Sequence, residues 1–365
     1  MLAVLVPRLG SGHARKTAGD ITPSSAELAY VPDPGQSKDA LTSARRWLEE
    51  FGQAALATVV STWGSSPVPV GGQMAIGPGG QFEGSVSGGC VEVDVITEAA
   101  DVLARDRPKL LEFGVGEELA WKAGLPCGGA ISIYVEPLQR ERDSAFLDRV
   151  FSARRARTSL AVLTTLATGE RRLFDTGAPM PAEIAQCLVS CESRLLSLGD
   201  APVFLHALTP PVRVVIVGAT HVGQVLADLA NRIGYDVVVV DPRAAFASAD
   251  RLGDLKNLTD WPEISLKALG LDPRTAVVTL THAAAIDDEA LTEALRSHCL
   301  YIGALGSTRT HAKRLQRLTA AGFNDAELAR ISAPVGLPIG AKGPAEIAVS
   351  ILAEIVQVAR ETRQG

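Results

Sequence analysis

One stretch of this 365-residue chain decides the fold of its C-terminal part: VRVVIVGATHVGQVLADLANRIGYDVVVVDPR, residues 212–243. A β-branched run is followed by a turn that contains glycine, a segment of helical periodicity that ends at Gly234, and a second β-branched run that ends at Asp241. This strand–helix–strand pattern is typical of the start of a Rossmann domain, in which parallel strands alternate with helices. We therefore expect a doubly wound, Rossmann-like parallel-sheet domain over residues 212–365.

The turn nearly matches the dinucleotide-binding pattern GxGxxG. Gly218 and Gly223 occupy the first and third glycine positions, whereas Thr220 replaces the middle glycine. His221 follows Thr220, and Asp241 lies 23 residues after Gly218, near the place from which an acid binds a ribose hydroxyl. Two interpretations stay open: these residues bind NAD(P), or the Rossmann scaffold has lost or changed its ligand.

The same alternation continues toward the C-terminus. We predict strands over 276–280 and 300–302, helices over 288–297 and 308–321, and a last helix that starts at Pro344. His282, in THAAAIDD, follows the first of these strands at its carboxyl end, the edge where doubly wound sheets place their ligands. His282 is therefore a candidate for proton transfer, and a solvated loop histidine is the alternative.

Residues 39–208 mix short strands with helices, which predicts an α+β domain. Apolar residues recur at helical spacing from Leu41 to Phe51, and Gly52 stands where a helix cap belongs. Further strands are predicted over 54–62, 74–76, 82–86, 109–113, 130–138 and 203–207, helices over 91–105, 139–153 and 181–198, and a hairpin turn at residues 168–169. Residues 1–38, rich in Gly and Pro, are expected to be a poorly ordered leader, and the stiff TPP at 209–211 is a linker.

Cys90 has the most informative surroundings of the five cysteines. It lies in GSVSGGCVEVD, residues 84–94, directly after Gly88 and Gly89 and directly before a predicted helix. Backbone N–H groups of such a loop and the helix dipole create a positive potential. They pull the pKa of a cysteine from about 8.5 into the range of about 3.5 to 7.5. Cys90 is therefore a candidate reactive thiolate, and a buried structural cysteine in a tight turn is the alternative.

Cys127 repeats this pattern in GLPCGG, residues 124–129, again beside a pair of glycines. The sequence has no CxxC zinc pattern and no histidine between residues 14 and 205, so thiol chemistry or contact with a soft ligand is the better interpretation. Cys187 and Cys191 lie four residues apart on a predicted helix, and Cys299 precedes a predicted strand. Ordinary packing accounts for these three.

The composition excludes several classes of function. The net charge is −6 and the 35 Lys and Arg residues are scattered, so we expect no binding of nucleic acid. The sequence contains no apolar stretch long enough to cross a bilayer, which predicts no membrane insertion. Five cysteines form an odd, sparse set without a disulfide framework, which favours a cytoplasmic protein.

At this point the motifs resemble those of a known family, the xanthine dehydrogenase accessory factors (XdhC/CoxI family). Three blocks carry the resemblance in the first domain: TVVSTWGSSPVPVGGQM, GSVSGGCVEVDV and GLPCGG. In the second domain the blocks are VVIVGATHVGQVLADLA, VVVVDPR, LTHAAAIDD, YIGALGSTRTHAKRL and PVGLPIGAKGPAEIAVSILAEI. The likeness spans roughly residues 40–360.

The resemblance implies an accessory protein that binds molybdenum cofactor and supports its sulfuration and its insertion into a molybdenum hydroxylase apoenzyme. It implies contacts with the cofactor at Ser65, Ser66, Gly88 and Gly89, and a contact between Cys90 and molybdenum or a transferred sulfur. The implied partners are the hydroxylase apoenzyme and a cysteine desulfurase. A homodimer is also expected.

The chain departs from the family pattern at Val68, where arginine is usual, at Thr220 and at Ala283. An arginine at position 68 would be a strong anion contact. Two alternatives therefore stay open. One is an NAD(P)-dependent oxidoreductase in which Cys90 and Cys127 are redox thiols and His282 moves protons. The other is an inert scaffold that bridges two partners.

Overall fold

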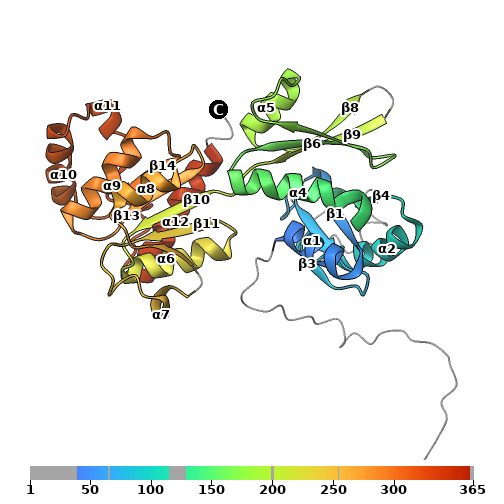
Figure 1. Cartoon of the computed structure of the whole chain (residues 1–365), viewed down its shortest axis with the longest axis horizontal. Coiled ribbons are helices and arrows are strands. Elements are labelled where there is room, and N and C mark those ends of the chain that lie inside the picture. Colours follow the sequence, from blue (N-terminus) through green and yellow to red (C-terminus); the bar gives the residue numbers. More distant parts are fainter. Residues whose placement is uncertain (1–38, 65, 115–128, 199–200, 254, 362–365) are drawn as a thin grey trace, which may run out of the picture. The chain divides into compact units, whose positions relative to one another are not determined.

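The computed structural model describes residues 39–64, 66–114, 129–198, 201–253 and 255–361 (Figure 1). The leader expected over residues 1–38 lies outside this range. The described residues form three sheets, two of them antiparallel and one parallel. This confirms the predicted fold class, a mixed α+β region followed by a Rossmann-like domain, while the predicted domain boundaries stay a prediction.

The first sheet has five antiparallel strands in the order β3-β2-β1-β5-β4. The strands are β1 (Gln53–Trp63), β2 (Gln73–Ile76), β3 (Phe82–Gly84), β4 (Lys109–Phe113) and β5 (Ala130–Gln139). Side chains alternate along β1, so Ala55 and Ala57 pack on the side of α2 (Glu92–Arg105) while Leu56 packs on the side of α1 (Ala40–Phe51). The central strand is thus buried on both faces.

The second sheet has four antiparallel strands in the order β7-β6-β9-β8, preceded in the chain by α4 (Arg140–Ala156). The strands are β6 (Leu160–Thr165), β7 (Arg171–Asp175), β8 (Arg194–Leu198) and β9 (Ala201–Leu208). The predicted hairpin at residues 168–169 is confirmed by β6 and β7. The helix predicted over 181–198 is wrong in its second half: α5 (Ala182–Ser190) ends where Cys191 adopts φ 53°, and β8 follows because it pairs with β9.

The third sheet has six parallel strands in the order β12-β11-β10-β13-β14-β15. Its strands are β10 (Arg213–Val217), β11 (Asp236–Val240), β12 (Lys256–Leu258), β13 (Thr275–Thr279), β14 (Tyr301–Ala304) and β15 (Ile331–Ser332). The next strands in the chain, β11 and β12, lie on one side of β10, and the later strands β13, β14 and β15 lie on the other. The strand order therefore reverses between β10 and β13, the point where open α/β sheets bind ligands at the carboxyl ends of their strands.

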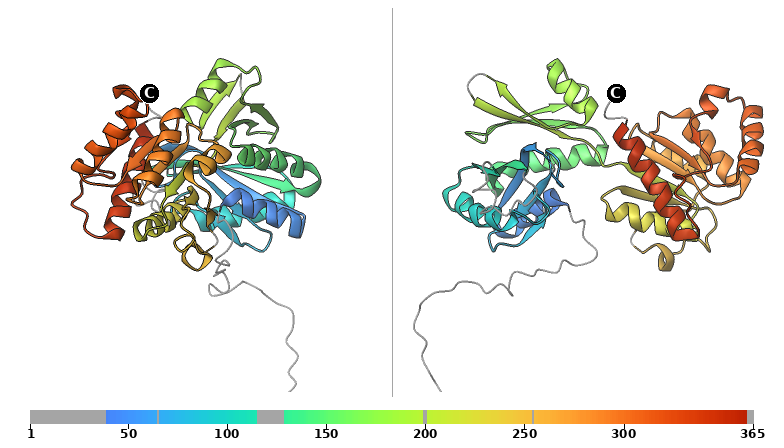
Figure 2. Two further views of the ribbon diagram at one scale, coloured as in Figure 1. Left: turned by 60° about the vertical axis from the view of Figure 1, so that its left-hand side comes forward. Right: turned by 180° about the vertical axis from the view of Figure 1, so that it is seen from behind.

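Helices cover both faces of the parallel sheet, as a doubly wound fold requires. Figure 2 shows α6 (His221–Arg232) and α12 (Pro344–Glu361) on one face, where they share a buried core. The opposite face is covered by α8 (Pro262–Leu269), α9 (Ala284–Arg296) and α10 (Thr308–Ala320). Short helices α7 (Ala249–Leu252) and α11 (Asp325–Leu328) complete the domain. Among the described helices, none has the length and apolarity needed to cross a bilayer.

Candidate functional site

The glycines of the Rossmann turn are required by packing. A Cβ on Gly223 would lie 2.2 Å from the carbonyl oxygen of Gly218, so only glycine lets α6 approach β10 this closely. Gly218 itself has φ 117°, a conformation that side chains disfavour. Thr220 caps α6, because its side-chain oxygen accepts a hydrogen bond from the Gly223 N–H at 3.3 Å, and His221 is exposed in the first turn. The departure from GxGxxG thus provides a helix cap.

Asp241 is fully buried, and its carboxylate is hydrogen-bonded to other residues of the chain. Its carboxylate accepts a hydrogen bond from the Ala219 N–H at 2.9 Å and two from the Arg243 guanidinium, both at 2.8 Å. Burial alone would raise the pKa of Asp241, but the hydrogen bonds from Arg243 and Ala219 hold it below its usual value. A ribose hydroxyl would have to displace Arg243, and NAD(P) binding at Asp241 stays a prediction.

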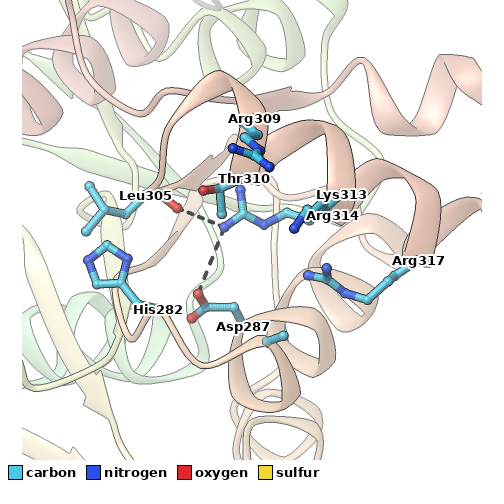
Figure 3. Close-up of a pocket in the computed structure, with 9 residues that line it drawn as sticks. His282, Asp287, Leu305, Arg309, Thr310, Lys313, Arg314 and Arg317 are labelled. Carbon is cyan, nitrogen blue, oxygen red and sulfur yellow. Dashed lines mark hydrogen bonds and ion pairs between the residues drawn. The ribbon is translucent and has the colours of Figure 1, made fainter.

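A basic pocket of about 280 Å³ lies beside the carboxyl ends of β13 and β14 (Figure 3). His282, which follows β13, and Asp287, in the first turn of α9, line one side of this basic pocket. The other side is lined by residues of α10: Arg309, Thr310, Lys313, Arg314 and Arg317. His282 is exposed and has φ 59°, in the left-handed region that non-glycine residues rarely adopt. The structure therefore places His282 at a cavity on the predicted edge of the sheet.

Asp287 and Arg314 form the buried floor of the basic pocket. Asp287 accepts hydrogen bonds from the Thr281 hydroxyl at 2.6 Å and from the Thr281 N–H at 3.3 Å. Burial raises the pKa of Asp287 above its usual value, although the bonds from Thr281 and the charge of Arg314 oppose this. Arg314 lies across the pocket with one nitrogen 4.0 Å from the Asp287 carboxylate.

The Cys90 loop, residues 85–91, is folded around the carboxylate of Glu92. The backbone N–H groups of five loop residues donate to Glu92 over 2.9 to 3.2 Å: Val86, Ser87, Gly88, Gly89 and Val91. The hydroxyls of Ser85 and Ser87 also donate to it. Burial would raise the pKa of Glu92, but these hydrogen bonds lower it to about 2. The loop is therefore an anion-binding nest, and the anion it binds is the side chain of Glu92.

Cys90 is exposed at the tip of this loop, together with Gly88 and Gly89. Its backbone N–H donates to the Ser87 hydroxyl at 2.9 Å, and the loop N–H groups that were predicted to stabilise a Cys90 thiolate bind Glu92 instead. A Cβ on Gly88 would lie 2.9 Å from the ring of Pro67, so Pro67 lies against the Cys90 loop. The structure thus brings together two of the predicted cofactor-binding segments.

The remaining predicted residues are less informative. Ser66 donates its hydroxyl to the carbonyl of Val68 at 2.8 Å, within its own turn. Ser65 and Cys127 lie outside the described residues. Cys187 and Cys299 are buried, and burial raises the pKa of Cys187 to about 11, in line with packing roles. The described residues contain no group of three His, Cys, Asp or Glu side chains arranged to hold a metal ion.

The sequence interpretation missed two residues on which these sites depend, Glu92 and Arg314. An acid in the first turn after a Gly-Gly loop was the available signal for Glu92, because such an acid can accept the free N–H groups of the turn. The signal for Arg314 was the spacing of Arg309, Lys313 and Arg317 around it, which places basic side chains on one face of a helix that follows a strand.

Comparison with known proteins agrees with these motifs. Residues 214–355 match the family described as XdhC Rossmann domain, and residues 47–114 match the XdhC and CoxI family. The molybdenum cofactor insertion chaperone PaoD of Escherichia coli (strain K12) is 32% identical over 84% of this chain and 83% of its own length. A protein of Bacillus subtilis (strain 168) named as a probable xanthine dehydrogenase subunit is 30% identical over 85% of this chain and 94% of its own length.

A solved structure shares the fold. It is described as a xanthine dehydrogenase from Bacillus halodurans and superposes with a TM-score of 0.71 at 26% sequence identity, covering 88% of this chain and 96% of that one. Identity of 30% or more to relatives that are matched over most of their length, together with both family matches, confirms the resemblance seen in the motifs. The chain belongs to the XdhC and CoxI family.

Proposed function

We propose that this protein is an accessory protein that binds molybdenum cofactor and supports its insertion into a molybdenum hydroxylase apoenzyme. The observation that carries the proposal is the 32% identity to a molybdenum cofactor insertion chaperone over 84% of the chain. An accessory role is also compatible with a family match that covers both the N-terminal region and the Rossmann domain.

The geometry of the Cys90 loop supports this role. Glu92 satisfies the N–H groups of the loop, so the loop can present an exposed thiol at a fixed position. A thiolate is a soft ligand suited to a metal that binds sulfur. The bound cofactor would supply that metal, and Cys90 would hold and orient it. Gly88 and Gly89, exposed beside Cys90, leave room for a ligand to approach.

Sulfuration is the finer part of the proposal. In that step a cysteine desulfurase persulfide transfers its outer sulfur to the Cys90 thiolate, which becomes the persulfide, and the desulfurase is left as a thiolate. The exposure of Cys90 supports such an exchange, because the attacking thiolate must reach the sulfur of the partner. A homodimer and a cytoplasmic location belong to the same proposal.

The oxidoreductase alternative has less support. A dinucleotide would need Asp241 for its ribose, and this carboxylate already accepts hydrogen bonds from Arg243 and Ala219. The pyrophosphate of a dinucleotide would also need to approach the backbone closely at the middle glycine position. Thr220 occupies this position and caps α6.

The test is identification of the small molecules that the protein carries. We would purify the full chain anaerobically from a host that makes molybdenum cofactor, denature it, and analyse the released molecules by mass spectrometry. The matched variants are Cys90→Ser and Cys191→Ser, which each remove one thiol. We expect a molybdopterin species from the wild type and from Cys191→Ser, and little or none from Cys90→Ser.

Other outcomes would overturn the proposal. Release of NAD(P) without a pterin would favour the oxidoreductase. Equal release of pterin from all three proteins would remove Cys90 from the binding site. An inert bridging scaffold would carry nothing and would lose nothing with Cys90→Ser.

A further inference from the structure

Arg314 is a buried cation with unused hydrogen-bond donors. Its side chain is 3% exposed, and one nitrogen (Nη2) donates to the carbonyl of Leu305 at 2.8 Å. The other two nitrogens, Nε and Nη1, are buried and have no hydrogen-bond partner in the described part of the chain. A buried charge and buried unpaired donors both cost free energy. Such a group in a native protein calls for a ligand, and an anion would satisfy it.

The opposing acid in the pocket compensates Arg314 only in part. Asp287 lies 4.0 Å from Nη2, beyond hydrogen-bond distance, and one of its oxygens accepts the bonds from Thr281. Asp287 therefore balances some of the charge of Arg314 but leaves its Nε and Nη1 donors unused.

The rim of the pocket adds positive charge. Arg309 and Lys313 are exposed on α10, and neither forms an ion pair with an acid among the residues that the structure describes. Arg317 is paired with Asp288 and contributes less. The N-terminal turn of α10, with Thr310 on the pocket wall, adds the positive end of the helix dipole. The field in the pocket thus favours an anion.

We propose that the basic pocket binds the phosphate group of a small phosphate or diphosphate ester, with Arg314 as the buried anchor and Arg309 and Lys313 at the rim. The two unpartnered nitrogens of Arg314, Nε and Nη1, can donate hydrogen bonds to the oxygens of a phosphate, an anion that guanidinium groups bind well. The volume of about 280 Å³ is at the lower limit of ligand pockets and suits a phosphate with part of its ester, rather than a whole dinucleotide. This site involves other residues than Cys90, and the inference does not rest on the function proposed above.

Binding of inorganic pyrophosphate to the full chain tests the inference. Isothermal titration calorimetry in phosphate-free buffer would compare the wild type with Arg314→Gln, with the rim variant Arg309→Gln/Lys313→Gln and with Lys267→Gln. Loss of a charged donor should weaken the affinity by roughly ten- to a hundredfold in the first two variants. Lys267 is an exposed lysine of α8 outside the pocket, so Lys267→Gln removes the same charge as Arg314→Gln and should bind like the wild type.

The controls keep the test decisive. The rim variant changes only exposed side chains, so it decides the matter if Arg314→Gln fails to fold. No binding of millimolar pyrophosphate to the wild type would overturn the inference. If Lys267→Gln weakened the affinity for pyrophosphate as much as the pocket variants, the inference would also be overturned. The loss would then come from the net charge of the domain and not from the pocket.

Two sources share this phosphate chemistry, a nucleotide and a phosphate-bearing pterin. Competition against pyrophosphate distinguishes them, with cytidine or adenosine monophosphate in one arm and the pterin released from a molybdenum enzyme in the other. Displacement that depends on Arg314 in either arm supports the site and names its ligand. Displacement in neither arm would overturn the assignment to an ester. Loss of pterin from Cys90→Ser with unchanged pyrophosphate binding would separate this site from the cysteine loop.

Discussion

Glu92 changes which ligand the glycine-rich loop before it can bind. The letters SGGC predict a loop whose N–H groups turn toward an anion, and the structure contains such a loop. Because Glu92 supplies the anion, the loop needs no ligand to reach this shape. The exposed thiol of Cys90 is then the part of the motif that remains available to a cofactor.

We predict that Glu92→Gln destabilises the protein by about 2 kcal/mol, because hydrogen bonds to a charged acceptor are replaced by weaker ones. The pKa of Glu92 is about 2 in the folded protein, below its ordinary value of 4.5. Its contribution is therefore fully present above pH 4.5 and is lost as the pH falls toward 2. Denaturant titrations at a series of pH values measure both effects.

The matched control is Glu112→Gln, which makes the same chemical change at an exposed position of β4. It should leave stability within about 0.5 kcal/mol of the wild type. If Glu112→Gln and Glu92→Gln were equally destabilised, the effect would come from net charge and not from the loop.

The turn between β10 and α6 sets the packing of the Rossmann element. We predict that Gly223→Ala destabilises the protein by about 1 to 3 kcal/mol, because the added methyl group overlaps the carbonyl oxygen of Gly218 and forces α6 away from the sheet. Thermal unfolding measures the loss. In Gly79→Ala the new Cβ meets only the end of the flexible Gln81 side chain, so a loss as large as that of Gly223→Ala would contradict the packing argument.

Thr220 gives a second prediction for the same element. If its role is to cap α6, Thr220→Ala should cost about 1 kcal/mol, whereas Thr220→Gly should cost only a few tenths. Equilibrium unfolding in urea can resolve this order. The reverse order, with glycine worse than alanine, would mean that the capping hydrogen bond to Gly223 contributes little.

Elements with a strong local signal could be predicted from the sequence. The helix bounded by Asp39 and Gly52 is confirmed, since a side-chain cap and a left-handed glycine fix both ends locally. The helix over 181–198 is wrong beyond residue 190, because pairing of β8 with β9 overrides the helical pattern. The burial of Arg314 was not predicted: Leu318, four residues later, lies on the same face of α10 and is buried, but a charged side chain on such a face is expected to reach solvent.

At the scale of the whole molecule, the buried cores are separate. Two core clusters flank the parallel sheet and contain only residues from Val212 onward. The other clusters of the described residues contain only residues up to Leu208. The Cys90 loop and the basic pocket therefore depend on different cores and share no hydrogen-bond partner among the described residues.

This separation predicts that changes at the two sites act independently. Glu92→Gln should speed hydrogen exchange in the Cys90 loop and the start of α2 but leave β10 and β13 unchanged, and Gly223→Ala should do the reverse. The double variant should lose the sum of the two single losses within about 0.5 kcal/mol. Hydrogen-exchange mass spectrometry and denaturant titration of the three variants measure this. Faster exchange of β10 in Glu92→Gln, or a coupling above about 1 kcal/mol, would contradict the prediction. It would mean that the cysteine loop and the Rossmann sheet respond as one unit, so a ligand at one site would change binding at the other.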